Sequence, residues 1–174
     1  MCRAVTHKTE DMKKIGILSD THAWWDDRYA HYFADCDEIW HAGDIGNEDV
    51  LDRLEALGPT VRAVYGNIDG AALRRRLKPT EIFVTEGVKV LLTHIGGYPG
   101  RYASGMRSRL ELTRPSVMVC GHSHILRVMP DRSLGVLVVN PGAAGRQGWQ
   151  TVRTLVTLTL DTGRVTHCQV IELH

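Results

Sequence analysis

The first two thirds of the chain alternate between short apolar runs and segments with helical spacing. Apolar runs of this length, bounded by polar turns, are typical of buried strands. The runs that we predict as strands in this part cover residues 15–19, 38–41, 61–65 and 88–93. Strands that alternate with helices favour a sheet covered by helices.

The segments between these strands carry the spacing of helices. Residues 48–57 repeat apolar side chains at helical intervals, and Asn47 stands where it can cap the first turn. Asp69 is placed to cap a shorter helix that runs through Leu77. Residues 102–112 form a further helical stretch. We therefore predict a helix in each of these connections.

The last third of the chain changes to strand-like patterns joined by tight turns. The runs that we predict as strands here cover residues 117–120, 125–129, 135–139, 152–160 and 164–173. Alternating strands and helices followed by hairpins predict an α/β (α+β) domain built in layers with mixed sheets. We expect residues 12–174 to form a single domain and residues 1–11 to be a poorly ordered N-terminal extension.

Composition and charge narrow the range of partners. Apolar residues make up 43% of the chain and charged residues 24%, which is ordinary for a globular protein. Lys and Arg number 21 against 20 Asp and Glu, so no charge imbalance points to a nucleic acid or a membrane. No secretory signal opens the sequence and no cysteine pair has CxxC spacing. We therefore expect a cytoplasmic protein with reduced thiols.

Polar clusters interrupt the chain where the predicted strands end. These clusters are Asp20-Thr21-His22, Gly43-Asp44, Gly66-Asn67, His94 and Gly121-His122-Ser123-His124. Ligands in open α/β sheets bind at the carboxyl ends of the strands, so the clusters are expected to converge on one pocket. Each cluster alone also fits a turn or a satisfied core histidine. The ordered series of them is hard to explain by turns.

The donor types in these clusters favour a pair of metal ions. Asp, Asn and His offer oxygen and imidazole nitrogen without a thiolate, which suits Mn, Fe, Zn, Ni or Co. The number of donors exceeds what one tetrahedral ion needs, and Asp44 is the candidate to bridge two ions. Two ions about 3.5–4 Å apart can clamp an in-line displacement at phosphorus and convert a shared water to hydroxide. The glycines before Asp44, Asn67 and His122 permit positive φ and close backbone approach.

The same clusters resemble the signature of the calcineurin-like metallophosphoesterases, from about Lys14 to Glu172. The short length resembles the small single-domain YfcE-type phosphodiesterases. The resemblance implies two facing mixed β-sheets flanked by helices. It also implies one ion held by Asp20, His22, Asp44 and His124, and a second ion held by Asp44, Asn67, His94 and His122. Of these residues, Asp44, Asn67 and His94 are expected to act in catalysis as well.

The sequence departs from the larger members of that superfamily at one residue. They carry a histidine after the asparagine, which is thought to protonate the leaving group, whereas this chain reads Gly66-Asn67-Ile68-Asp69. Small relatives often lack that histidine too. General acid catalysis is typically worth ~10²–10⁴-fold, so we predict faster turnover of aryl phosphodiesters than of alkyl phosphate esters. Asp69 is expected to cap the next helix or to support a ligand histidine.

Residues outside the series receive weaker assignments, and no substrate-binding residue is assigned. Relatives often have serine where Ala143 stands, so a hydroxyl contact is expected to be missing. Tyr98 and Arg101 follow His94 and can reach a phosphate or lie on a solvated loop. The remaining assignments are turn or substrate roles for Asn140 and Arg146, packing or pocket-mouth roles for Trp24 and Trp25, a supporting role for His41, a buried position for Cys120, and pocket-shaping loops at 23–29 and 96–104.

The sequence analysis thus predicts a metal-dependent phosphodiesterase that acts on a small phosphodiester through a metal-bridging hydroxide. We expect two divalent ions, with Mn²⁺ preferred and Fe, Zn, Ni or Co as alternatives. By resemblance, a homodimer is expected. The alternative function is a catalytically weak or inactive scaffold of the retromer-subunit type. A nuclease ranks last because the chain is short and near neutral.

Overall fold

The computed structural model describes residues 12–174, in which two five-stranded sheets and a small hairpin form. The prediction for residues 1–11 therefore lies outside the described residues. The first sheet has the strand order β12 (Arg164–Leu173), β11 (Arg153–Asp161), β1 (Met12–Leu18), β2 (Glu38–His41) and β3 (Thr60–Ala63). The second sheet has the order β4 (Thr80–Thr85), β5 (Val88–Thr93), β8 (Val117–Val119), β10 (Val136–Asn140) and β9 (Arg127–Asp131). The hairpin joins β6 (Gly97–Tyr98) and β7 (Arg101–Tyr102).

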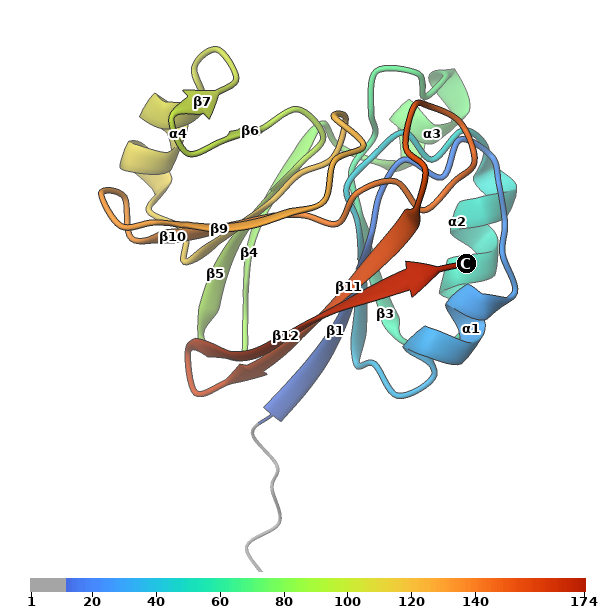
Figure 1. Ribbon diagram of the computed structural model, residues 1–174, viewed down its shortest axis with the longest axis horizontal. Helices are drawn as coiled ribbons and strands as arrows, with labels where there is room; N and C mark the ends of the chain where they lie inside the picture. The colour runs from blue at the N-terminus through green and yellow to red at the C-terminus, as the bar shows by residue number, and fades with distance from the viewer. Residues whose placement is uncertain (1–11) are drawn as a thin grey trace, which may run out of the picture.

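Both sheets combine a parallel centre with antiparallel edges. β1, β2 and β3 are parallel, as are β5, β8 and β10. The antiparallel strands β11 and β12 extend the first sheet, and β4 and β9 close the edges of the second. Helices cover the outer faces of the sheet pair (Figure 1). The predicted fold class, two facing mixed sheets flanked by helices, is confirmed.

Alternation along the strands builds the core between the sheets. In β1, Ile15 and Ile17 are fully buried and belong to a cluster that includes Val90 of β5 and Val119 of β8. Successive side chains of a strand point to opposite faces. Leu18 accordingly joins a different cluster, under the helices of the first sheet. One strand therefore supports two apolar layers.

The helices pack as outer layers. The elements α1 (Arg28–Phe33), α2 (Glu48–Glu55) and α3 (Ala71–Arg76) contribute to the cluster on the first sheet, and α4 (Met106–Thr113) packs on the second. Asn47 caps α2 as predicted, because its side-chain oxygen accepts a hydrogen bond from Val50 N at 3.1 Å. Cys120 is buried beside α4, also as predicted.

Several local predictions were wrong. Asp69 does not cap α3, whose N-cap is Gly70, because the Asp69 carboxylate accepts hydrogen bonds from other loops. The helix predicted from residue 102 begins at Met106, because Tyr102 pairs in the β6–β7 hairpin. Strand β4 and helix α1 were missed. β4 lies at a sheet edge and buries only one of its six residues, Thr85, and α1 buries only Tyr29 and Phe33.

Candidate metal centre

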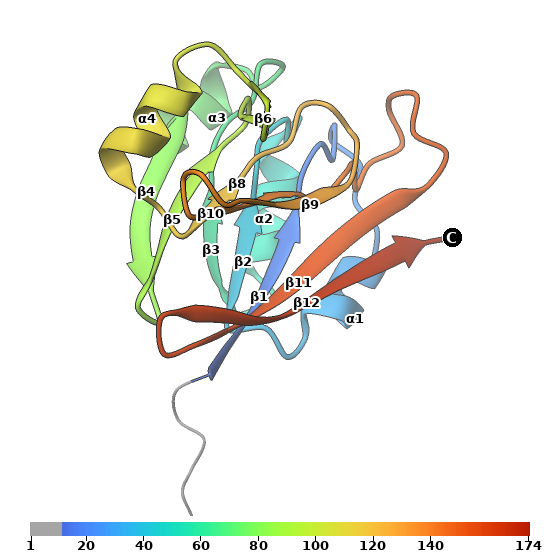
Figure 2. The same cartoon turned by 60° about the vertical axis from the view of Figure 1, so that its left-hand side comes forward.

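The seven predicted ligands follow the carboxyl ends of parallel strands in both sheets. Asp20 and His22 follow β1, Asp44 follows β2, Asn67 follows β3, His94 follows β5, and His122 and His124 follow β8. In Figure 2, β1 runs upward and β4 runs downward, and β5 is antiparallel to β4. The parallel strands of both sheets therefore end at the same edge of the molecule, where the polar loops meet.

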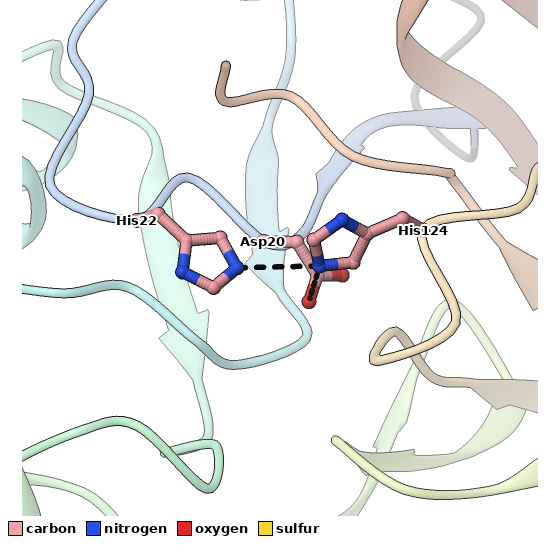
Figure 3. A group of neighbouring side chains, drawn as sticks. All are labelled: Asp20, His22 and His124. Atoms are coloured by element: carbon pink, nitrogen blue, oxygen red, sulfur yellow. Dashed lines mark hydrogen bonds and ion pairs between the residues drawn. The ribbon is translucent and has the colours of Figure 1, made fainter. Parts of the chain in front are cut away.

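Asp20, His22 and His124 form the first group of converging side chains (Figure 3). The Nε2 atoms of His22 and His124 lie 3.2 Å apart, and His124 Nε2 lies 3.2 Å from Asp20 Oδ1. Asp20 Oδ1 is buried and accepts no geometrically sound hydrogen bond from the residues that the structure describes. A buried carboxylate oxygen without a partner is costly, so this group suits a cation.

Asp44, His94 and His122 form the second group, and Asn67 lies beside it. His94 Nε2 is 3.2 Å from Asp44 Oδ1 and 3.1 Å from Asn67 Oδ1. The rings of His94 and His122 pack edge to face with centroids 5.2 Å apart. Asp44 and His94 are buried, whereas His122 and Asn67 are exposed. The exposed members leave this side of the centre open to solvent.

Asp44 connects the two groups through its two carboxylate oxygens. Oδ1 faces His94 at 3.2 Å, and Oδ2 faces His22 of the first group at 3.9 Å. A carboxylate that presents one oxygen to each of two ligand groups has the arrangement needed to bridge two ions. The geometry brings together all seven predicted residues.

Hydrogen bonds on the far side of two imidazoles fix which nitrogen faces the centre. His94 Nδ1 lies 2.7 Å from the carbonyl oxygen of Ala42, which can only accept, so Nδ1 carries the proton. His124 Nδ1 lies 3.0 Å from Gln150 Oε1, and the Gln150 amide nitrogen donates to Gly145 O and Gln147 O. In the neutral ring, each Nε2 lone pair then points at carboxylate oxygens. Lone pairs that converge in this way fit a bound cation.

Most of these ligands occupy left-handed backbone. Non-glycine residues rarely adopt positive φ, and such strain clusters at functional sites. The candidate ligands with positive φ are Asp20 (54°), His22 (47°), Asp44 (53°), His122 (68°) and His124 (57°). The loops hold these residues in a costly conformation that turns their side chains toward one another.

The glycines beside the ligands act mainly through close approach. Gly43 has a φ of 92°, as predicted, but Gly66 and Gly121 lie outside the positive-φ region. A Cβ atom on Gly66 would collide with the Asp44 carboxylate, and one on Gly121 would collide with the Ser19 side chain. The prediction of positive φ was therefore wrong for these two glycines, and the prediction of close approach is confirmed.

Polar residues beneath the centre hold the ligand loops. The Asp69 carboxylate accepts hydrogen bonds from the backbone N–H groups of Ile45, Gly46 and Gly66, at 2.7–3.2 Å. It thereby ties the Asp44 loop to the Asn67 loop. His41 accepts from Gly43 N at 3.1 Å and lies 3.0 Å from Thr21 Oγ1. The supporting role predicted for His41 is consistent with these contacts.

Charge and burial set the pKa values in the centre. Burial lowers the pKa of His22. Burial acts in the same direction on His94, but hydrogen bonding to Asp44 and the charge of Asp20 raise its pKa overall. Burial opposes ionisation of Asp44, yet the His94 ring in its protonated form and a hydrogen bond from Ile68 N hold the pKa of Asp44 below the usual value. Asp44 thus stays ionised and favours positive charge between the rings.

The residues with weaker assignments lie around this centre. Trp24 stacks under Arg146, with the guanidinium carbon 3.9 Å from the ring centroid. Trp25 packs edge to face on Tyr29, with ring centroids 5.4 Å apart. Ala143 is fully buried. Asn140 donates to Gly121 O at 2.8 Å and to Ser123 Oγ at 3.1 Å, which holds the loop of His122 and His124.

Sequence reasoning missed the support that Gln150 gives to His124. The two residues lie 26 positions apart, and Gln150 belongs to a loop without apolar periodicity. The sequence pattern also assigned no role to Arg127, although that residue lies beside Tyr98. In both cases the signal is a spatial contact between segments far apart in the sequence rather than a motif.

Comparisons with known proteins agree with this architecture. The family model for the calcineurin-like phosphoesterase superfamily domain matches residues 12–163. A probable metallophosphoesterase of Methanothermobacter thermautotrophicus is 34% identical over 142 residues, which cover 74% of this chain and 76% of that protein. The solved structure of an archaeal phosphodiesterase is 26% identical with a TM-score of 0.70, covering 92% of this chain and 99% of that chain.

A further structural neighbour is similar in fold alone. Vacuolar protein sorting 29 of Cryptosporidium parvum has a TM-score of 0.72 at 15% identity, covering 94% of this chain and 99% of that chain. Among residues 12–174, no helix is long and apolar enough to cross a membrane.

Proposed function

This chain belongs to the calcineurin-like phosphoesterase superfamily, and from that premise we propose that it is a phosphodiesterase with a dinuclear metal centre. The observation that carries the proposal is the convergence of two ligand groups on the two oxygens of Asp44. Similarity to an archaeal phosphodiesterase supports the phosphodiester as the substrate class.

In this proposal Asp20, His22, Asp44 and His124 hold one ion, and Asp44, Asn67, His94 and His122 hold the other. The buried Asp20 Oδ1, which accepts no hydrogen bond from the described residues, and the inward-facing Nε2 atoms of His94 and His124 support this division. The donors are nitrogen and oxygen atoms, which suit Mn²⁺, with Fe, Zn, Ni or Co as alternatives. When bound, the ions supply Lewis acidity toward phosphate oxygens and lower the pKa of a water molecule.

The chain itself supplies orientation rather than a proton. His94 is fixed through Ala42 O, and Ile68 N donates to Asp44 Oδ1 at 3.0 Å, so the Asp44 carboxylate is held in place. Ile68 stands where larger relatives carry the histidine that is thought to protonate the leaving group, and its side chain has no proton to donate to a departing oxygen. The leaving group must then depart as a stable anion, which favours phenols over alcohols.

The test is an assay of chelated protein reloaded separately with Mn²⁺, Fe²⁺, Zn²⁺, Ni²⁺ or Co²⁺. We expect bis-p-nitrophenyl phosphate to turn over about 100-fold faster than a glycerol phosphodiester, the scale of a missing general acid. The phosphomonoester p-nitrophenyl phosphate is the control for bond type. A faster alkyl ester would contradict the assignment of Ile68, and a faster monoester would contradict the phosphodiesterase assignment.

The alternative is a scaffold without useful catalysis. Its support is the fold shared with vacuolar protein sorting 29, and the sequence identity to that protein is low enough to indicate similarity of fold alone. The presence of all seven predicted ligands argues against it. The same assay distinguishes the enzyme from the scaffold, because a scaffold shows no metal-dependent hydrolysis with any of the five ions.

A further inference from the structure

A cavity of about 160 Å³ opens beside His122 and extends away from the metal centre. Its walls include the β6–β7 hairpin and the start of β9, which contribute Tyr98, Arg101 and Arg127. The residues that line the cavity in the described structure include no carboxylate. The volume is several times the ~30 Å³ that a water molecule occupies in the liquid, so a group of several heavy atoms fits.

Arg127 is the unusual feature of this cavity. Its side chain is half buried, and its guanidinium carbon lies 3.8 Å from the centroid of the Tyr98 ring. Its Nε is fully buried and has no hydrogen-bond partner among residues 12–174. Arg127 also forms no ion pair with another described residue, in contrast to Arg153, which binds Asp26 at 2.8 Å. The cavity therefore contains a positive charge that the described structure leaves uncompensated.

A partly buried guanidinium without a counter-charge is unfavourable, and an anion relieves it. The planar donors of arginine match the oxygens of a carboxylate or a phosphate in a two-point contact. Stacking on Tyr98 fixes the plane of the Arg127 guanidinium, which reduces the entropy lost when it binds. Arg101, which is exposed on β7, adds a second positive charge at the rim.

We propose that this cavity binds a second anionic group of the substrate, a carboxylate or a terminal phosphate, through Arg127 with support from Arg101. The inference rests on the proposed phosphodiesterase function. His122 belongs both to the second ligand group and to the cavity wall, so the anionic group is attached close to the scissile phosphorus. The preferred substrate is then a phosphodiester that carries an extra negative charge on one of its ester groups.

Matched substrates separate charge from size. The first is 2-carboxyethyl p-nitrophenyl phosphate, and its methyl ester is the neutral control with the same leaving group. A third compound carries a terminal phosphate in place of the carboxylate, which distinguishes the two sources of negative charge. We expect kcat/KM for at least one anionic compound to exceed that of the methyl ester by about 10- to 100-fold, as charge-assisted hydrogen bonds allow.

Arg127→Met keeps the apolar stem over Tyr98 and removes the charge and the donors. It is expected to abolish the preference for the anionic compound and to change turnover of the methyl ester by less than about 3-fold. Arg132→Met removes the same charge from an exposed position outside the cavity, on the turn after β9, and is expected to keep the preference. Arg101→Met provides a second test that does not depend on a buried position, with a smaller loss expected.

A binding measurement keeps this inference separate from the proposed activity. Calorimetric titration with the non-hydrolysable phosphonate analogues is expected to show tighter binding of the anionic analogue, and Arg127→Met is expected to remove the difference. Selective binding without hydrolysis would contradict the phosphodiesterase and retain the anion site. Hydrolysis with equal kcat/KM and equal binding for charged and neutral compounds would overturn the anion site and retain the enzyme.

Discussion

His94 and His124 stand on opposite sides of the candidate centre and are oriented by different kinds of partner. His94 is nearly inaccessible, and its Nδ1 is fixed by the backbone carbonyl of Ala42, at the end of a central strand. His124 is 17% exposed, and its Nδ1 is fixed by the side-chain amide of Gln150, which follows a run of exposed loop residues. One side of the centre is thus built into the sheet, whereas the other depends on a surface loop.

Two ions with similar donors can therefore differ in how firmly they are retained. Partners that orient a ligand histidine commonly contribute 10–100-fold to metal affinity. A backbone carbonyl in a packed sheet cannot swing away without disrupting the strand, but a glutamine on a loop can. We therefore expect the ion held by His94 to be retained more firmly than the ion held by His124.

Asp44→Asn is expected to weaken the binding of both ions. The amide is neutral and presents only one acceptor oxygen, so it cannot serve both groups. Activity is expected to fall by about 10³-fold or more, because charge stabilisation worth several kcal/mol is lost with the ions. Metal content, measured by mass spectrometry, is expected to fall at both positions.

Asp20→Asn is the matched control for the Asp44 variant. Asp20 faces His124 at 3.2 Å and belongs only to the first group. Its loss is therefore expected to remove one ion and leave the other. If both variants lose the same amount of metal, the assignment of Asp44 as the shared ligand is wrong.

Protonation of His41 is expected to destabilise the folded protein on the side of the centre that is built into the sheet. Burial lowers the pKa of His41 to about 4 from its ordinary value of 6.5, against the opposing charges of Asp69 and Asp20. The unfolded chain therefore takes up this proton first as the pH falls. The contribution of His41 to stability is full above about pH 6.5 and declines between pH 6.5 and 4, by about 3 kcal/mol in total.

The measurement is urea unfolding of chelated protein between pH 7 and pH 4. His41→Gln is expected to flatten the pH dependence relative to the wild type, whatever its effect at pH 7. His31→Gln, at an exposed position on α1, controls for loss of a histidine and is expected to leave the slope unchanged. Equal slopes for the wild type and His41→Gln would show that His41 does not titrate in this range.

The same contrast explains what the sequence could predict. Asp20, Asp44 and His94 lie within three residues of the ends of largely buried strands, so a local pattern marks them, and the topology of parallel strands brings them together. The partners of these ligands come from distant turns. Gln150 is an ordinary polar loop residue in sequence, and Asp69 is predicted there as a helix cap or as a support for a ligand histidine. Only their hydrogen bonds to His124 and to the Asp44 loop reveal their function.

Fold prediction failed where elements are short or lie at an edge. Helix α1 buries two side chains in a single segment, which is too little for a periodic pattern. Strand β4 pairs only with β5, and along it Ile82 and Val84 are exposed while Thr85 is buried, so its apolar positions do not mark the buried face. The misplaced start of α4 has a different cause, since Tyr102 is recruited into the hairpin by pairing with Gly97.

Gln150→Ala is the smallest of these changes, and it acts on only one side of the centre. It removes the acceptor from His124 Nδ1 and leaves every predicted ligand in place. We expect the affinity of one ion to fall by about 10- to 100-fold and that of the other to change little. Competition of a chromophoric chelator for bound Mn²⁺ measures the two affinities separately.

Gln147→Ala is the matched control, because its side chain is exposed and only its backbone oxygen contacts Gln150. It is expected to bind both ions as the wild type does. If Gln150→Ala also retains both affinities, the loop does not orient His124, and the proposed asymmetry of the centre loses its physical basis. If both affinities fall together, the two ions are coupled through Asp44 more strongly than their separate supports imply, because the bridging carboxylate can bind one ion well only while the other is present.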